Sequence, residues 1–552
     1  MNITKFLSVS LIVLATVIGF NMNAANVDVN AARLAANNFL KLRCATPGSL
    51  KAPALADLRL AHAEASSVDR SANAYYAFNI DGGGFVIVSG DDRASKVLGF
   101  SDKGRLDFNN MPDNLMALLN DYKRQIEYLQ ANPSLNVPQR RISENTEVIV
   151  EPLTKTQWGQ LMPYYLQCPM YRGYYCKVGC AGVQMAQILY YWEFPKTCGP
   201  IAGYTCSLIS TTLEDLPETT FDYSKMLLSY CHWDFDLGET VQDVYTDEQA
   251  QEVAKLCRYV GQAAKMSYAV GGSSTDGNKK LNGMKTLGYN SSAKNLSRTS
   301  AYTTESWENL MRAELDAGRP IMYGAKHVGN TSVSHAFIFD GYDSNDYFHI
   351  NLGWFGVNDG WFLTTAIITT TLTGDYRDYG ANHYMFVDMA PPVYCKVIVQ
   401  DIDAESDLLI LGETLHSQAT GVSLYTTFSD VDMTFTLADQ EGNRVATSEP
   451  INIVKSEFVQ RSNINGAITL PTTLNDGTYD LQFNYLMDGT ETTVGTSQGK
   501  LTVSGKFAKF NTKFTIGDVI TLIDYLLVGT PSSGLQVTID DVTSLIDVIL
   551  MQ

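Results

Sequence analysis

A cysteine that directly precedes an apolar, helix-like run is the first residue here that could do covalent chemistry. The run "GCAGVQMAQILYYWEFP" places Cys180 after Gly179, at the expected N-terminus of a helix. A thiolate is the nucleophilic form of cysteine, and the positive end of a helix dipole favours it by lowering the thiol pKa. Gly179 and Gly182 leave room for a substrate backbone. Cys180 is therefore a candidate nucleophile, and the alternatives are a buried packing thiol or half of a disulfide.

A cysteine nucleophile needs a base, and the chain has seven histidines. His335 has the most informative surroundings, because "SVSHAFIFDGYDSNDYFHINLGWFGVNDGWF" predicts an antiparallel hairpin with its turn near residues 343–346. Such a hairpin brings Asn351 and its neighbours roughly opposite His335, where an amide could hold the imidazole in the tautomer that accepts the thiol proton. The alternative is a strand histidine that hydrogen-bonds to backbone groups.

The other cysteines indicate neither a metal site nor a defined disulfide pattern. The chain has nine cysteines, and an odd number leaves at least one thiol unpaired within a monomer. Cys176 and Cys180 have no second Cys or His pair nearby, so no zinc site is predicted, and the chemistry needs no cofactor. Disulfides are the more plausible alternative, although some of these residues can be buried thiols; the candidates are Cys168, Cys176, Cys198, Cys206, Cys231 and Cys257.

The bulk composition limits the partners and the compartment. A net charge of −19 and a pI near 4.8 exclude nucleic acid as the main partner, because phosphate backbones need clustered Lys and Arg. Residues 1–25 have Lys5 before an apolar run and end in small residues, which is typical of a secretory signal peptide. No later run approaches 18 apolar residues, so no transmembrane segment is predicted in the mature chain. We expect a secreted or cell-surface protein.

The signal peptide is followed by four further predicted segments, which differ in pattern: 26–145, α+β; 146–391, a larger α+β domain; 392–505, a β-sandwich; and 506–552, two short helices. Between the first two, residues 131–151 are polar, contain two prolines and include Arg140 and Arg141. This composition predicts an exposed linker that a protease can cut.

The tail contains an internal repeat. Residues 515–527 and 538–550 share eight of thirteen residues at an offset of 23, and each has the apolar spacing of an amphipathic helix. The tail resembles dockerin-type modules, in which a calcium loop precedes each helix. The early ligand positions of the two loops lack carboxylates, so poor calcium binding is predicted; they hold Phe507, Lys509, Asn511, Thr530, Ser532 and Gly534. A docking module with an unidentified partner and a simple cap on the sandwich both remain open.

Several motifs in the same order resemble the streptopain family of papain-fold cysteine peptidases of bacteria. They are "TQWGQLMPYYLQCP", "GCAGVQMAQILYYWEFP", "RPIMYGA" and the hairpin around His335, while "YYAFNIDGGGFVIVSGDDRASKVLGFSDKG" resembles that family's inhibitory propeptide. The resemblance implies that Cys180 is the nucleophile, His335 the general base and Gln160 the oxyanion donor. It further implies that Asn351 and Trp354 lie in the segment that orients and shields the histidine.

Two departures from the family pattern concern the site. Leu352 of "NLGW" replaces an aromatic residue near the histidine, and "AGVQMAQ" after Cys180 stands where small and β-branched residues are usual. Neither departure removes a proton-transfer group.

The predicted fold class is α+β: a papain-like peptidase domain between an α+β propeptide and a β-sandwich with a two-helix tail. The predicted function is a secreted cysteine endopeptidase made as a zymogen, with protein or peptide substrates and its own propeptide as inhibitor. The alternative is a catalytically inactive papain-like protein that serves in surface binding or adhesion.

Overall fold

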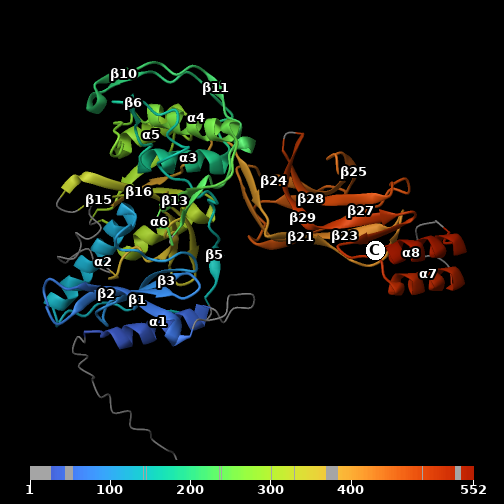
Figure 1. Ribbon diagram of the computed structural model, residues 1–552, viewed down its shortest axis with the longest axis horizontal. Coiled ribbons are helices and arrows are strands. Elements are labelled where there is room, and N and C mark those ends of the chain that lie inside the picture. The colour runs from blue at the N-terminus through green and yellow to red at the C-terminus, as the bar shows by residue number, and fades with distance from the viewer. Residues whose placement is uncertain are drawn as a thin grey trace, which may run out of the picture. The chain divides into compact units, whose positions relative to one another are not determined.

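The computed structural model describes residues 26–43, 54–140, 142–143, 146–234, 236–237, 239–299, 301–327, 330–368, 383–487, 489–528 and 536–551. Two compact units divide the chain, Met1–Met389 and Ala390–Gln552 (Figure 1). The predicted signal peptide, 1–25, and Cys44 lie outside the described residues. Among the described helices, none combines the length and apolar character needed to cross a membrane.

One antiparallel sheet runs through the first unit, in the order β1-β2-β3-β4-β18-β17-β16-β15-β19-β14, with β5 paired to β16. Its strands are β1 (Leu58–Ala65), β2 (Asn73–Ile80), β3 (Phe85–Ser89), β4 (Val97–Ser101), β5 (Val148–Val150), β14 (Lys294–Ser297), β15 (Ile321–His327), β16 (Asn330–Asp343), β17 (Phe348–Asn351), β18 (Gly360–Phe362) and β19 (His383–Val387). Strand β4 pairs with β18 through Phe100 opposite Trp361. The strands of the predicted propeptide therefore continue the sheet of the predicted peptidase domain.

The described residues of the first unit form six α-helices: α1 (Val29–Arg43), α2 (Asp113–Ala131), α3 (Cys180–Trp192), α4 (Asp247–Ala263), α5 (Gly277–Thr286) and α6 (Thr304–Asp316). Figure 1 shows α3, α4 and α5 gathered at one end of the sheet and α1 beside β1 to β3 at the other. Short strand pairs add β6 (Met170–Tyr171) with β7 (Tyr174–Tyr175), β8 (Thr197–Cys198) with β11 (Thr219–Thr220), β9 (Tyr204–Cys206) with β10 (Thr211–Leu213), and β12 (Cys231–Asp234) with β13 (Glu239–Gln242).

Helix α3 is buried along most of its length. It begins at Cys180, directly after Gly179, whose φ of +81° suits glycine; a Cβ on Gly179 would lie 2.4 Å from the carbonyl oxygen of Ser273. Every residue from Ala181 to Leu189 is buried, as expected for a helix that is apolar on all sides. Gln184 and Gln187 are the only polar residues in that stretch, so their amides must find partners inside the protein.

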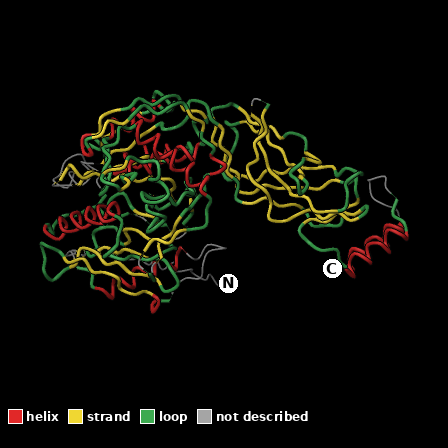
Figure 2. The backbone as a smooth tube through the Cα atoms, turned by 45° about the horizontal axis from the view of Figure 1, so that its top comes forward, coloured by secondary structure: helices red, strands yellow, loops and turns green. Residues whose placement is uncertain are grey.

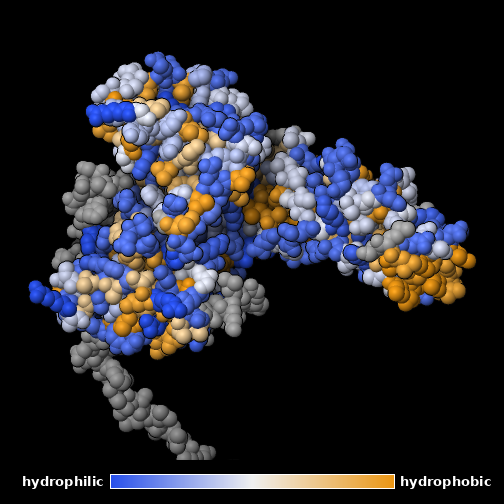
Figure 3. All heavy atoms as spheres, viewed as in Figure 1, coloured by the Kyte–Doolittle hydropathy of each residue, from blue (hydrophilic) through white to orange (hydrophobic). Residues whose placement is uncertain are grey.

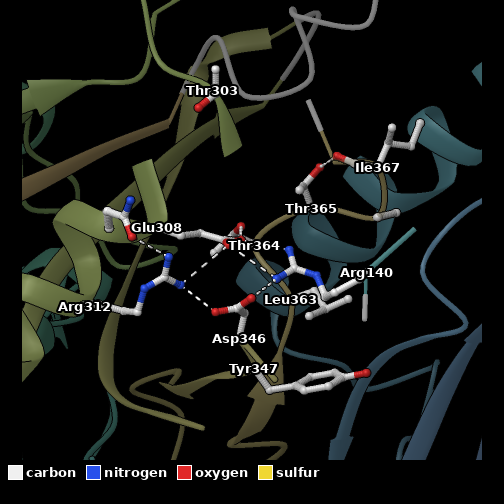
Figure 4. A network of polar contacts seen from close by, with 12 residues as sticks. Arg140, Thr303, Glu308, Arg312, Asp346, Tyr347, Leu363, Thr364, Thr365 and Ile367 are labelled. Atoms are coloured by element: carbon white, nitrogen blue, oxygen red, sulfur yellow. Dashed lines mark hydrogen bonds and ion pairs between the residues drawn. The ribbon is translucent and has the colours of Figure 1, made fainter. Parts of the chain in front are cut away.

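The linker is not uniformly exposed, so that prediction is wrong at Arg140. The Arg140 side chain is 6% exposed and lies 3.0 Å from Glu308 of α6 and 2.8 Å from Asp346 in the β16–β17 turn. Arg312 also pairs with Asp346, at 2.6 Å (Figure 4). The partners of Arg140 are distant in sequence, so the polar composition of the linker did not indicate its burial.

We predict that Arg140→Met lowers the free energy of unfolding of the first unit by about 3 kcal/mol, because the buried Glu308 loses its nearer cation and keeps only Arg312 at 3.9 Å. It should also speed cutting of the linker by thermolysin. The control is Arg59→Met, which removes an exposed pair with Asp81 and should leave the stability almost unchanged. Equal effects of the two variants in chemical denaturation would contradict the prediction.

The second unit is a β-sandwich, and Figure 2 shows its helices confined to the C-terminal end. One sheet contains β20 (Cys395–Ile398), β21 (Asp401–Ala404), β23 (Thr414–Thr426) and β27 (Ser462–Thr469). The other contains β22 (Leu409–Ile410), β24 (Asp430–Ala438), β25 (Arg444–Thr447), β26 (Ile451–Val454), β28 (Gly477–Met487), β29 (Thr490–Ser504) and β30 (Phe507–Phe510). Leu415, Phe435 and Phe483 are among the fully buried side chains between them.

The two tail helices, α7 (Ile516–Val528) and α8 (Ile539–Met551), pack on the sandwich. They share a small core with Ile410 and Phe507 of the sandwich. At the start of α7, Asp518 accepts both hydrogen bonds of the Lys509 ammonium at 2.8 Å. At the equivalent position of α8, Asp541 lies 3.0 Å from Lys506. Lysine side chains thus neutralise the two repeated carboxylates.

Lys509→Met should lower the free energy of unfolding of the second unit by about 3 kcal/mol, since it strands a buried carboxylate. The matched control is Lys506→Met, because the side chain of Lys506 is 40% exposed whereas that of Lys509 is 10% exposed. A loss within about 1 kcal/mol is expected for the control. Chemical denaturation of both variants checks the difference, and equal losses would refute it.

Candidate active site

Cys180 differs from its neighbouring cysteines in exposure. All eight described cysteines are free thiols, and those between residues 168 and 257 are buried except Cys180. Burial raises the pKa of Cys168 to about 12 and that of Cys198 to about 11, so these thiols stay protonated near neutral pH. The cysteines near Cys180 are therefore buried thiols and do not form disulfides. Cys180 is the one partly exposed thiol among the described residues of the first unit.

Helix α3, which begins at Cys180, packs against β16, the strand that contains His335. The Gln184 side-chain amide donates to the carbonyl of Phe337 at 2.5 Å. Cys180 precedes Gln184 by one helical turn, about 6 Å, and His335 precedes Phe337 by two strand residues, about 6.6 Å. One turn further along α3, Gln187 contacts Asn351, which is opposite Ile338, so helix and strand advance in the same direction. The N-terminus of α3 and His335 thus lie on the same side of the Gln184–Phe337 hydrogen bond.

The predicted hairpin forms, but its register differs from the expectation for Asn351. The turn lies between β16 and β17 as predicted, and Asn351 pairs with Ile338, whereas His335 pairs with Ala325 of β15. The turn itself lies where it was predicted, and a turn centred within residues 343–346 places Asn351 opposite residue 338; the register shift between Phe339 and Gly341 changes the pairing by only one residue. Asn351 is therefore three residues further along β16 than "roughly opposite His335" implied.

The amide of Asn351 is fully buried and connects three segments. It donates to the carbonyl of Thr156 at 2.8 Å, and its oxygen accepts from the backbone N–H of Gly353 at 3.0 Å and from Gln187 at 3.2 Å. These contacts fix the start of the loop after β17 against α3. Asn351 thus anchors the segment that contains Leu352, which is itself buried.

Gln160 and Trp354 lie in two loops that meet beside α3. The backbone N–H of Val178 donates to the carbonyl of Gln160 at 3.3 Å, two residues before Cys180. The N–H of Phe355 donates to the carbonyl of Trp158 at 3.1 Å, and a Cβ at Gly159 would meet the Phe355 ring at 2.2 Å. The structure therefore gathers the segments of Gln160, Cys180 and Trp354, and both Gln160 and Trp354 are partly buried.

Helix α2, which precedes the linker, contacts the segments next to His335 and around Leu352. Asn114, near the start of α2, is buried and donates to the carbonyl of Leu352 at 2.8 Å and to that of Ala336, next to His335, at 3.4 Å. Further along α2, Asp121 lies 3.0 Å from His383 of β19. Sequence reasoning missed these contacts, because an asparagine near a helix start has no pattern that indicates a distant partner.

A second group of titratable residues lies one strand away. His349 pairs with Asp340 at 2.7 Å, and although burial alone lowers the pKa of His349, this carboxylate raises it above its usual value. Burial raises the pKa of Asp359 to about 7, and its carboxyl accepts the N–H of Leu352 at 2.8 Å. Within the described ranges, no group of His, Cys, Asp and Glu side chains has an arrangement that holds a metal ion.

Comparison with known proteins gives matches over much of the first unit. Residues 158–362 match the Peptidase C10 family, and residues 24–126 match the Spi protease inhibitor. Streptopain of Streptococcus pyogenes is 28% identical over 329 residues, which cover 56% of this chain and 78% of the relative. The thiol protease/hemagglutinin PrtT of Porphyromonas gingivalis is 25% identical over 497 residues, or 85% of this chain and 54% of the relative. A prointerpain A fragment of Prevotella intermedia is 24% identical, covers 60% of this chain and 98% of that chain, and has a TM-score of 0.48.

These matches define a cysteine peptidase made as a zymogen, with an inhibitory propeptide before the peptidase domain. The peptidase segment is thus similar to the Peptidase C10 family and to streptopain. Its substrates are therefore peptides, and its propeptide is its inhibitor.

Asp359 predicts how the stability of the zymogen depends on pH. The carboxyl holds its proton up to about pH 7 in the folded chain, whereas an aspartate in an unfolded chain loses it near pH 4. The folded state binds more protons in this window, so this residue makes stability fall as pH rises from about 4 to about 7. Asp359→Asn removes the titration and should raise the melting temperature more at pH 7.5 than at pH 4. A gain that is the same at both pH values would contradict this.

Proposed function

We propose that this chain is a secreted cysteine endopeptidase that works through a Cys–His acyl-enzyme mechanism, with Cys180 as nucleophile and His335 as base. The observation that carries the proposal is the contact of Gln184 with Phe337, which aligns the N-terminus of α3 with the end of β16 that contains His335. The partial exposure of Cys180 among buried thiols supports the same choice. A thiol at a helix N-terminus beside an imidazole is the arrangement that stabilises a thiolate.

In the proposed reaction, Cys180 Sγ attacks the scissile carbonyl carbon while His335 takes the thiol proton. The side-chain amide of Gln160 and the backbone N–H of Cys180 donate hydrogen bonds to the oxyanion that develops. His335 then gives the proton to the leaving amine, and water hydrolyses the thioester with His335 as base. Asn351 and Trp354 would hold and shield the segment beside the imidazole. No cofactor takes part.

The same proposal assigns residues 26–145 to the propeptide and 146–391 to the peptidase domain. Asn114 lies against the carbonyls of Ala336 and Leu352, so the propeptide occupies space next to His335. Cutting within 131–151 would sever the covalent connection between the two. The propeptide must then also leave the sheet, because β4 pairs with β18.

For the remaining segments, we propose a sandwich over 392–505 and a helical module over 506–552 that docks a partner. Apolar side chains gather over α7 and α8 in Figure 3. Equivalent residues of the two repeats are equally exposed: Ile516 at 72% and Ile539 at 74%, and Leu527 and Leu550 both at 78%. Such exposed apolar stripes are typical of interaction surfaces. Docking at this surface is consistent with a secreted or cell-surface location.

The first test is the intact mass of the purified zymogen after incubation under reducing conditions. We expect the wild-type chain to lose a fragment that ends within residues 131–151, whereas Cys180→Ala stays intact because it lacks the nucleophile. The matched control is Cys395→Ala, since Cys395 is a partly exposed free thiol of the second unit, and this variant should process like the wild type. Processing of the pure Cys180→Ala protein would overturn the assignment. An unprocessed wild type that is not alkylated at Cys180 after propeptide removal would favour the inactive, binding-protein alternative.

A further inference from the structure

Lys280 of α5 is buried without a countercharge. Its side chain is 0% exposed, and within the described part of the chain it forms no ion pair with a carboxylate. The ammonium instead donates to the Gln184 side-chain oxygen at 2.9 Å and lies 5.0 Å from the ring centroids of both Tyr384 and Phe386. Aromatic faces attract a cation, and a charge taken this far from water needs such compensation. A buried lysine in this setting calls for a reason beyond stability.

The partner of Lys280 is the residue that joins α3 to the central strands. The nitrogen of the Gln184 amide donates to the carbonyl of Tyr323 on β15 at 2.7 Å and to that of Phe337 on β16 at 2.5 Å. A lysine ammonium can only donate, and a backbone carbonyl can only accept. An amide has one side of each kind, so it is suited to lie between them. Lys280 thereby fixes which way the Gln184 amide points.

We infer that Lys280, acting through Gln184, is a positioning residue that sets the distance between Cys180 and His335. The inference rests on the proposed function. Gln184 lies one turn after Cys180 on α3, and Phe337 lies two residues after His335 on the same face of β16. The bridge Lys280–Gln184–Phe337 therefore holds the helix against the strand immediately behind the two groups. Rates of covalent catalysis are sensitive to such spacing, because a shift of about 1 Å can cost about 10²-fold.

The bridge depends on the length of the side chain at position 184, in the helix that begins at Cys180. A small residue there could not reach both carbonyls. The Gln184 amide and the buried Lys280 thus act together: Lys280 needs the Gln184 oxygen as its acceptor, and that oxygen needs Lys280 as its donor.

The test compares kcat and KM in processed enzyme, on a fluorogenic peptide that the wild type cleaves. Lys280→Met keeps the length of the side chain and removes its charge, and we expect kcat to fall about tenfold or more while KM stays unchanged, because Lys280 does not touch substrate. The matched control is Lys279→Met on the same helix, which removes an exposed pair with Asp276 and should leave both constants unchanged. An unchanged kcat in Lys280→Met overturns the inference.

A double variant separates positioning from simple stabilisation. Lys280→Met leaves the Gln184 oxygen without its donor. Combining it with Gln184→Met removes that unsatisfied oxygen, although the carbonyls of Tyr323 and Phe337 lose the amide donor, so the melting temperature should recover in part. If the bridge positions the site, kcat stays low in the double variant although stability partly returns. If kcat returns together with stability, the role is structural and the inference is wrong.

Gln184→Glu decides the question if Lys280→Met does not fold. This change offers Lys280 an opposite charge but gives the carbonyls of Tyr323 and Phe337 no donor, so a loss of kcat is again expected, and an unchanged kcat overturns the inference. Wild type and Cys180→Ala are measured alongside. A wild type without Cys180-dependent hydrolysis overturns the proposed function and this inference with it, whereas an active wild type with an unaffected Gln184→Glu variant overturns the inference alone.

Discussion

The site depends on the contact between a buried helix, α3, and the strands β15 and β16. A helix that is apolar on all sides has no preferred rotation or translation against an apolar sheet, because hydrophobic burial is not directional. The two glutamines supply the missing direction: Gln184 bonds to the backbones of β15 and β16, and Gln187 bonds to Asn351. An unsatisfied buried amide is costly, so a small shift of α3 would break several bonds together. These hydrogen bonds fix where α3 lies on the sheet, and they therefore also fix the position of Cys180.

The inhibitory propeptide uses the same sheet rather than a separate surface. Strand β4 pairs with β18, and α2 places Asn114 and Asp121 against the strands that contain Ala336 and His383. Backbone pairing supplies affinity with little dependence on side chains, while the α2 contacts decide where the helix lies. In the zymogen the propeptide and the peptidase domain belong to one chain, so their pairing does not need a high affinity until the linker is cut. Release of the propeptide then exposes β18 as a sheet edge.

Local pattern predicts the elements of this protein well and their long-range partners poorly. The helix at Cys180, the hairpin after His335 and the repeated tail helices are encoded in short periodicities and turn residues. The pairing of Asn351 with Ile338 follows from the predicted turn, but the bulge that shifts the register by one residue is not specified by composition. The burial of Arg140 and Lys280 could not be predicted either, since isolated basic residues in a polar linker or on a short helix usually face water.

Those basic residues share a physical role that explains why each is buried. Arg140 joins the linker to α6, Lys280 joins α5 to α3, and Lys509 joins the sandwich to α7. A buried cation with matched acceptors adds little net stability over an apolar pair, but displacing it leaves an uncompensated charge. Each of these contacts therefore has one favourable geometry, and any other geometry costs free energy because it leaves the charge without its acceptors. Hydrophobic packing brings these segments together, and the cations restrict them to one arrangement. For α3 that restriction matters most, because the same helix contains Cys180.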